Sequence, residues 1–235
     1  SEGKIVVTGG TDSSTQTPFT GTYEADANST VVNPLTTLAT ALVDAGKSRE
    51  DAAATVVSWL GIVEGVDLAN YDPIAGAAGG GSGAGSVFAA STRVATAMKQ
   101  ASAFIKFASD GAADEKFASA QLVDGLANKL AAGDMTALGD VDAMTVVLTT
   151  VSTASGYSSF VSASDIAGAA ALIGAADELI VDTCSSSSGS TTLAVDLVKI
   201  QAVVEDSVVK GYDQLILDGG TPSGLSASLS KEMLA

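Results

Sequence analysis

The sequence contains no histidine and a single cysteine, Cys184. Without histidine the chain cannot form an imidazole-dependent catalytic triad or a histidine-ligated zinc site, and most transition-metal chemistry is disfavoured. A lone cysteine forms no internal disulfide and no Cys-x-x-Cys site. Because Cys184 has no histidine or cation beside it in the sequence, we expect an inert residue at a helix end, with an intermolecular disulfide as the alternative.

Long apolar runs and aromatic residues are also scarce. No uninterrupted apolar run reaches the roughly 18 residues of a membrane span. Residues 1–4 are not followed by the apolar stretch of a signal peptide, so the signal of an exported protein would have been removed or would lie in a longer precursor. Aromatic residues make up 5% of the chain, whereas 46% is hydrophobic and much of that is Ala and Val. Small side chains let helices approach closely, which predicts tightly packed helices.

Charge of one sign dominates the composition. The chain carries 27 acidic and 11 basic residues, a formal net charge of −16. This field repels phosphate groups, so we expect no nucleic-acid partner and no binding to anionic membranes. Such acidity suits a secreted or cell-surface protein in a calcium-containing medium. An acidic surface that merely keeps the protein soluble is the alternative.

Residues 30–46 mark the point where a β-rich N-terminus gives way to helices. Asn33 is a favourable helix N-cap, and Pro34 suits the first helical position because it needs no amide partner. An apolar stripe with helical spacing follows, and Gly46 stands where a left-handed residue would end the helix. The stripe consists of Leu35, Leu38, Ala39, Leu42 and Val43.

The N-terminal residues predict a β-hairpin. Residues 4–8 (Lys-Ile-Val-Val-Thr) indicate one strand, and alternation over residues 19–24 indicates a second. Two strands alone are marginally stable in water, so the hairpin must lean on the helices or complete a sheet with another domain or subunit. We therefore divide the chain into a β-hairpin segment at residues 1–30, a candidate for sheet augmentation, and an Ala-rich helical domain at residues 31–235.

The remaining pattern predicts a mainly α fold, an antiparallel bundle of about seven helices preceded by the N-terminal β-hairpin. Trp59 is expected to fill the core between the first helices, with a ligand platform as the alternative. The stretch from Leu215 indicates a short apolar patch and a turn, and residues 225–235 one weak helix. The seven helices are expected at residues 34–46, 48–61, 87–108, 114–133, 136–153, 164–180 and 191–209.

Residues 75–86 are rich in glycine and serine and are interpreted as a flexible linker. The stretch resembles a phosphate-binding loop only in its glycines, since the GxxxxGK[ST] pattern is missing and no lysine follows before Lys99. It also lacks the strand–GxGxxG–helix context of a dinucleotide-binding fold. Nucleotide binding is therefore not expected.

Four short motifs carry a family resemblance: Thr-Gly-Gly-Thr-Asp at residues 8–12, Pro-Phe-Thr-Gly-Thr at 18–22, Asn-Pro-Leu-Thr-Thr-Leu at 33–38 and Val-Asp-Leu-Ala-Asn-Tyr-Asp-Pro-Ile at 66–74. Together they resemble modules of very large bacterial exported proteins, including cyanobacterial and proteobacterial adhesin-like proteins with calcium-binding or Ig-like repeats. The resemblance covers about residues 8–110. It implies a secreted or cell-surface structural module. As a single 235-residue unit, this chain fits self-association better than adhesion through a long stalk of repeats.

We therefore expect an extracellular structural module that self-assembles, as a subunit of a filament or surface layer, through its N-terminal β segment. The expected partners are further copies of the chain or other surface proteins. A calcium-dependent adhesin or a ligand-binding module of a larger surface protein is the alternative.

Calcium is the one cofactor that the sequence leaves open. Calcium prefers several carboxylate and carbonyl oxygens, and the candidate ligands are Asp134, Asp140 and Asp142, with Asp110 and Asp114 as a second cluster. Neither cluster matches an EF-hand loop, so helix caps and solvated turns are the competing interpretation.

Catalysis is not expected. Adjacent acidic residues such as Glu205 with Asp206, or Asp114 with Glu115, could in principle act as acid and base. Neighbouring residues point to different faces of a helix, however, and acidic pairs are common in so acidic a chain. No catalytic residue is assigned.

Overall fold

The computed structural model describes residues 3–11, 19, 21–79, 83–113, 115–158, 161–186 and 190–218. These residues form a pair of antiparallel strands followed by helices, which confirms the predicted mainly α fold with an N-terminal hairpin. In chain order the elements are β1 (Lys4–Thr8), β2 (Thr22–Asp26), α1 (Pro34–Asp44), α2 (Arg49–Leu60), α3 (Pro73–Gly79), α4 (Ala84–Ala108), α5 (Glu115–Ala132), α6 (Val141–Ala154), α7 (Ala163–Ser186), α8 (Ser190–Val204), a π-helical turn (Glu205–Val209) and α9 (Lys210–Asp218).

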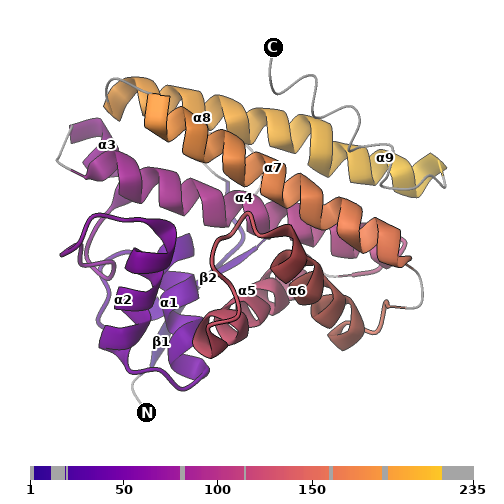
Figure 1. Ribbon diagram of the computed structural model, residues 1–235, viewed down its shortest axis with the longest axis horizontal. Helices are drawn as coiled ribbons and strands as arrows, with labels where there is room; N and C mark the ends of the chain where they lie inside the picture. The colour runs from indigo at the N-terminus through magenta and orange to yellow at the C-terminus, as the bar shows by residue number, and fades with distance from the viewer. Residues whose placement is uncertain are drawn as a thin grey trace.

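Helix α4 lies at the centre of the molecule. In Figure 1 it crosses the middle, with α7 and the continuous rod of α8, the π turn and α9 on one side, and the hairpin, α1, α2, α5 and α6 on the other. It packs against α1, α3, α5, α6, α7 and all three parts of the C-terminal rod. Sixteen of its 25 residues are buried, which is why the other helices are arranged around it.

The first two helices begin as their sequences predict. The side chain of Asn33 accepts hydrogen bonds from the backbone N–H groups of Leu35 (2.9 Å) and Thr36 (3.0 Å), and Pro34 opens α1. Ser48 caps α2 by accepting a hydrogen bond from the N–H of Asp51 at 3.1 Å. Gly46 follows α1 in the left-handed conformation, with φ of 98°, as expected after a helix end.

The predicted linker at residues 75–86 is wrong at both ends. Helix α3 covers its first part and α4 begins at Ala84, while residues 80–82 lie outside the described residues. The reason is a cap that precedes the glycines: Asp72 Oδ1 accepts hydrogen bonds from Ile74 N (2.9 Å) and Ala75 N (3.1 Å), and Pro73 opens the helix. Packing against α4 and α8 then offsets the poor helix propensity of glycine.

Helices α6 and α7 begin at capping residues that differ from the predicted starts. Helix α6 starts at Val141 rather than at residue 136, because Asp140 accepts a hydrogen bond from the N–H of Ala143 at 3.0 Å. Helix α7 starts at Ala163, where Ser162 and Asp165 exchange hydrogen bonds in a capping box.

The C-terminal rod extends further than predicted. Leu215 lies in α9 rather than in a turn, and residues 225–235 lie outside the described residues. Its buried residues follow at intervals of four after Ile200: Val204, Val208 and Tyr212. In a regular α-helix, where each residue turns the chain by about 100°, such spacing would rotate the stripe away from α4. The wider π turn takes up the difference and places Tyr212 beside Phe104, with ring centroids 6.1 Å apart.

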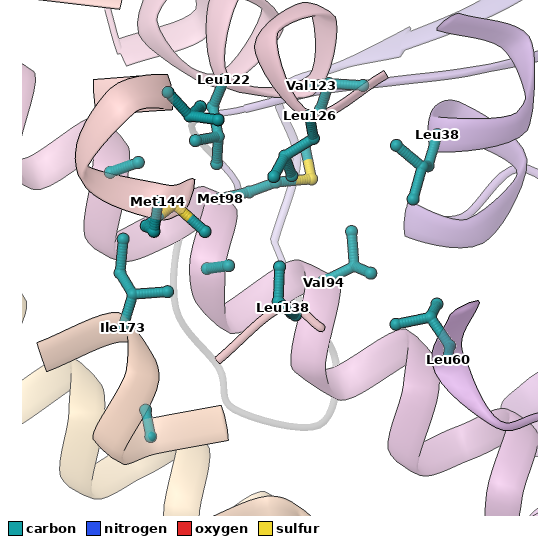
Figure 2. Packing of buried hydrophobic residues seen from close by; sticks show 14 of the residues in the cluster. Leu38, Leu60, Val94, Met98, Leu122, Val123, Leu126, Leu138, Met144 and Ile173 are labelled. Atoms are coloured by element: carbon teal, nitrogen blue, oxygen red, sulfur yellow. The ribbon is translucent and has the colours of Figure 1, made fainter. Parts of the chain in front are cut away.

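The core is aliphatic and closely packed, as the composition suggests. Figure 2 shows labelled side chains from α1, α2, α4, α5, α6, α7 and the segment before α6 converging on it. Glycine allows the closest helix approach: a Cβ atom at Gly125 of α5 would lie 2.9 Å from Cγ1 of Val147 on α6. Trp59 is half-buried at the margin of this core. Among the described residues, no helix is long and apolar enough to cross a membrane.

One buried ion pair links three helices. Arg93 of α4 donates to both carboxylate oxygens of Asp177 on α7, at 2.6 and 3.0 Å, and donates a third hydrogen bond to the carbonyl of Leu60, the last residue of α2, at 3.2 Å. The two charged side chains are 11% and 7% exposed. This pair therefore fixes α2 and α7 to the central helix.

We predict that Arg93→Met lowers the free energy of unfolding by about 3 to 5 kcal/mol, because it leaves the Asp177 carboxylate buried without a counter-charge. Urea unfolding followed by circular dichroism measures the loss. The double variant R93M/D177L removes both charges and should lose less than R93M alone. Lys199→Met, which breaks the surface pair with Asp196, should cost under about 1 kcal/mol; an R93M loss no larger than this would contradict the assigned role.

Candidate functional site

The N-terminal hairpin has one strand packed on the helices and one strand on the outside. Strands β1 and β2 pair antiparallel, with Lys4 opposite Asp26 and Thr8 opposite Thr22. β2 packs against α1 and α5, and Ala25 is completely buried. β1 lies on the outside, where Val6 is 54% and Val7 41% exposed. The hairpin thus packs on the helices mainly through β2.

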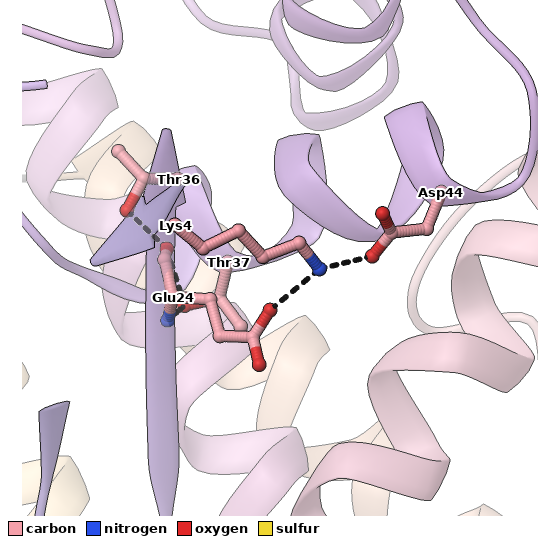
Figure 3. Close-up of polar contacts among 5 residues, drawn as sticks. All are labelled: Lys4, Glu24, Thr36, Thr37 and Asp44. Atoms are coloured by element: carbon pink, nitrogen blue, oxygen red, sulfur yellow. Dashed lines mark hydrogen bonds and ion pairs between the residues drawn. The ribbon is translucent and has the colours of Figure 1, made fainter. Parts of the chain in front are cut away.

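The outer edge of β2 is closed by threonine side chains from α1 (Figure 3). The N–H of Glu24 donates to Oγ1 of Thr37 at 2.9 Å, and the hydroxyl of Thr36 donates to the carbonyl of Glu24 at 3.0 Å. Both threonines are buried, so these bonds satisfy backbone groups that water does not reach. The first turn of α1 therefore takes the place of a third strand at the centre of this edge.

The outer edge of β1 is open. In an antiparallel pair, successive residues direct their backbone groups alternately toward and away from the partner strand. Gly3 faces β2, since its carbonyl accepts a hydrogen bond from Ala27 N at 3.1 Å, whereas Glu24 faces α1. Val6 lies opposite Glu24 and therefore directs its N–H and C=O away from β2. In the described part of the chain the sheet has two strands, and no third strand meets these groups.

A charge cluster fixes β1 to the helices (Figure 3). The ammonium of Lys4 bonds Glu24 Oε2 at 3.1 Å and also contacts the carboxylate of Asp44 at the end of α1. Burial alone would lower the pKa of Lys4, but the hydrogen bonds to Asp44 and Glu24 outweigh it and raise the pKa. On the same hairpin, Arg49 of α2 pairs with Asp26 at 2.8 Å.

Asp124 of α5 adds a further carboxylate beside this cluster. Partial burial raises its pKa, and the charges of Asp44 and Glu24 raise it further, with Lys4 acting in the opposite direction. Asp124 is nevertheless still in contact with solvent. The cluster therefore contains more negative than positive charge, and Asp124 is the member whose ionisation the fold opposes.

Each of the three predicted calcium ligands has a different local environment. Asp140 caps α6, Asp142 is exposed in the first turn of that helix, and Asp134 lies 3.5 Å from the ammonium of Lys129. Among the described residues, no three acidic or cysteine side chains are grouped as metal ligands would be. Of the second predicted cluster, Asp110 belongs to the described residues and Asp114 lies outside them. Calcium binding remains a prediction.

The other residues that the sequence singled out are also placed. Glu205 pairs with Lys99 of α4 at 2.6 Å, and Asp206 pairs with Lys210 at 2.5 Å, so the two adjacent carboxylates serve different partners. Cys184 is a half-buried free cysteine in the last turn of α7, where a helix-end residue was expected.

Comparison with protein-family models found no matching family, and comparisons with curated proteins and with solved structures likewise found no match. The resemblance to modules of exported bacterial proteins stays a prediction based on the four motifs.

We predict that Asp124→Asn raises the free energy of unfolding at pH 7. A raised pKa in the folded state means that protonated Asp124 favours folding, and this contribution is lost as the pH rises through the folded-state pKa. Asparagine removes the unfavourable carboxylate. The gain should therefore shrink as the pH falls and vanish below the ordinary pKa of 3.8.

Urea titrations between pH 7 and pH 3 measure this difference. Glu64→Gln, at an exposed position in the connector after α2, is the matched control. A D124N variant that is less stable than the wild type at pH 7 would contradict the assignment.

Proposed function

We propose that this protein is a structural module that associates with further copies of itself through the open edge of β1. The observation that carries the proposal is the asymmetry of the hairpin: threonines of α1 close the edge of β2, while the outward backbone groups of β1 have no partner among the described residues and two of its valines are exposed. Such an edge is a template for another strand, because main-chain hydrogen bonds and apolar contacts form together.

The geometry favours a two-fold dimer as the first product. Because β2 is closed at Glu24, each copy offers one open edge among the described residues. Two β1 strands that pair antiparallel place the same surface on both sides of the interface, which closes the assembly at two copies. The continuous sheet would run β2–β1–β1–β2. A filament or surface layer therefore needs a second contact elsewhere on the chain.

We place the module outside the cell, either secreted or on the cell surface. The net charge of −16 and the resemblance of residues 8–110 to exported modules support this location. High negative charge also limits unspecific association, so contacts between copies would be confined to surfaces such as β1, where backbone pairing supplies the attraction.

We predict that Val6→Pro weakens self-association without unfolding the hairpin. The N–H of Val6 points away from β2, so proline removes a donor from the open edge and none from the β1–β2 ladder. In a two-fold dimer one bond is lost from each copy, about 1 to 3 kcal/mol in total, which raises the dimer dissociation constant roughly 5-fold to 150-fold.

Sedimentation velocity over a range of concentrations measures this constant, and circular dichroism checks the fold. Val6→Thr keeps the amide and the β propensity, so it should dimerise better than V6P. A wild-type chain that stays monomeric at all concentrations would overturn the proposal, as would V6P that dimerises as tightly as the wild type.

A further inference from the structure

A cavity of about 430 Å³ opens beside the hairpin, on the side of α1 and α2. Its walls come from the start of β1, the turn after β2, α1, the first turns of α2 and the segment at residues 66–69. This volume lies within the range of small-molecule sites in proteins. It is separate from the outward edge of β1 used in the proposed self-association, although Lys4 contributes to both regions.

The large apolar part of the lining is buried or half-buried, and we call it the floor of the cavity. Ala39 and Val43 of α1, Ala53 of α2, and Val66 and Leu68 of the connector form it. No aromatic residue is among the described residues that line the cavity. The floor therefore fits an aliphatic group, and it lacks the aromatic cage that recognises quaternary ammonium ions.

The rim carries an excess of negative charge. Lys4 and Arg49 contribute two positive charges, and four carboxylates contribute four negative ones, a net −2; the carboxylates are Asp26, Asp44, Glu50 and Asp67. The two cations already pair with Asp44 and Asp26. Glu50 and Asp67 are thus the carboxylates in excess, and each can accept hydrogen bonds from a cation that carries N–H groups.

The wall that carries Asp67 is held in place by the fold. Asp67 accepts hydrogen bonds from Ala69 N at 3.1 Å and from the side-chain amide of Asn70 at 2.7 Å. Thr30, after the hairpin, donates its N–H to the carbonyl of Ala69 at 2.9 Å and its hydroxyl to the Asn70 amide oxygen at 2.9 Å. The connector is thereby tied to the hairpin, so the cavity is formed before a ligand enters and little ordering is needed on binding.

We infer that this cavity binds a small aliphatic primary amine, with its hydrocarbon part on the apolar floor and its ammonium group at the Glu50 and Asp67 side of the rim. The charge selects a cation over an anion, the volume selects a small molecule, and the lack of aromatic residues selects an N–H donor over a quaternary ion. The inference does not depend on self-association.

Three ligands with one ring and different head groups test this inference: cyclohexylmethylamine, cyclohexylmethanol and cyclohexanecarboxylate. Protein-observed NMR titrations at constant ionic strength should show saturable shifts for the amine at Ala39, Val43 and Ala53. Binding of the carboxylate should be at least about tenfold weaker, equivalent to about 1.4 kcal/mol. The same titration of V6P should give the same amine affinity, which separates this site from the dimer interface.

Two variants locate the site. Ala53→Leu fills the cavity and should abolish the shifts, whereas Ala131→Leu, at an exposed alanine near the end of α5, should leave them unchanged. Glu50→Gln keeps the shape of the rim and should weaken the amine while leaving the alcohol unaffected; Glu64→Gln is its control. E50Q also keeps the test decisive if A53L fails to fold.

The inference is overturned if the amine produces no saturable shifts up to about 10 mM, a limit well above the millimolar affinity of a weak specific site. It is equally overturned if the amine, alcohol and carboxylate bind alike, or if the shifts lie away from the cavity.

Discussion

The pairing of Arg93 with Asp177 is the interaction on which the arrangement of the helices depends. A guanidinium that meets a carboxylate through two bonds accepts few relative orientations of the helices that carry them. Because Leu60 takes the third bond, the end of α2 is fixed to the same point. The backbone comes close as well: a Cβ atom at Gly139 would lie 3.0 Å from Oδ2 of Asp177. Four segments distant in sequence thus meet around one charge pair.

The sequence predicts the helices that begin at a strong capping residue. Asn33 and Ser48 are strong caps, and the helices predicted at residues 34–46 and 48–61 begin directly after them in the structure. The sequence does not predict helix α3, because its glycines have poor helix propensity; the cap at Asp72 is local, but the contacts with α4 that support this helix are visible in no local pattern. The ion pair could not be predicted from the sequence either, because Arg93 and Asp177 are 84 residues apart and neither stands in a distinctive motif.

The hairpin was predicted, together with its need for support, but not the form of that support. Thr36 and Thr37 were part of the motif that suggested a family, yet nothing in the sequence says that they bond a strand edge. Their role required knowing that Glu24 lies beside the first turn of α1. The same holds for Asp124, whose altered ionisation arises from residues of β2 and α1. Functional surfaces of this kind depend on tertiary proximity rather than on residue spacing.

The π turn in the C-terminal rod has a consequence for how that rod sits on α4. Before the turn, Leu197 and Ile200 face the core with the spacing of a regular α-helix. After the turn, Tyr212 faces the core as well, because the π turn holds one residue more than an α-helical turn would. The parts of the rod before and after the turn therefore both pack against the central helix. Rewinding the turn as an ordinary α-helix with all its residues kept would rotate Tyr212 by about 100° away from its aromatic contacts with Phe104 and Phe107, whereas removal of one residue from the turn would let an ordinary helix keep Tyr212 in place.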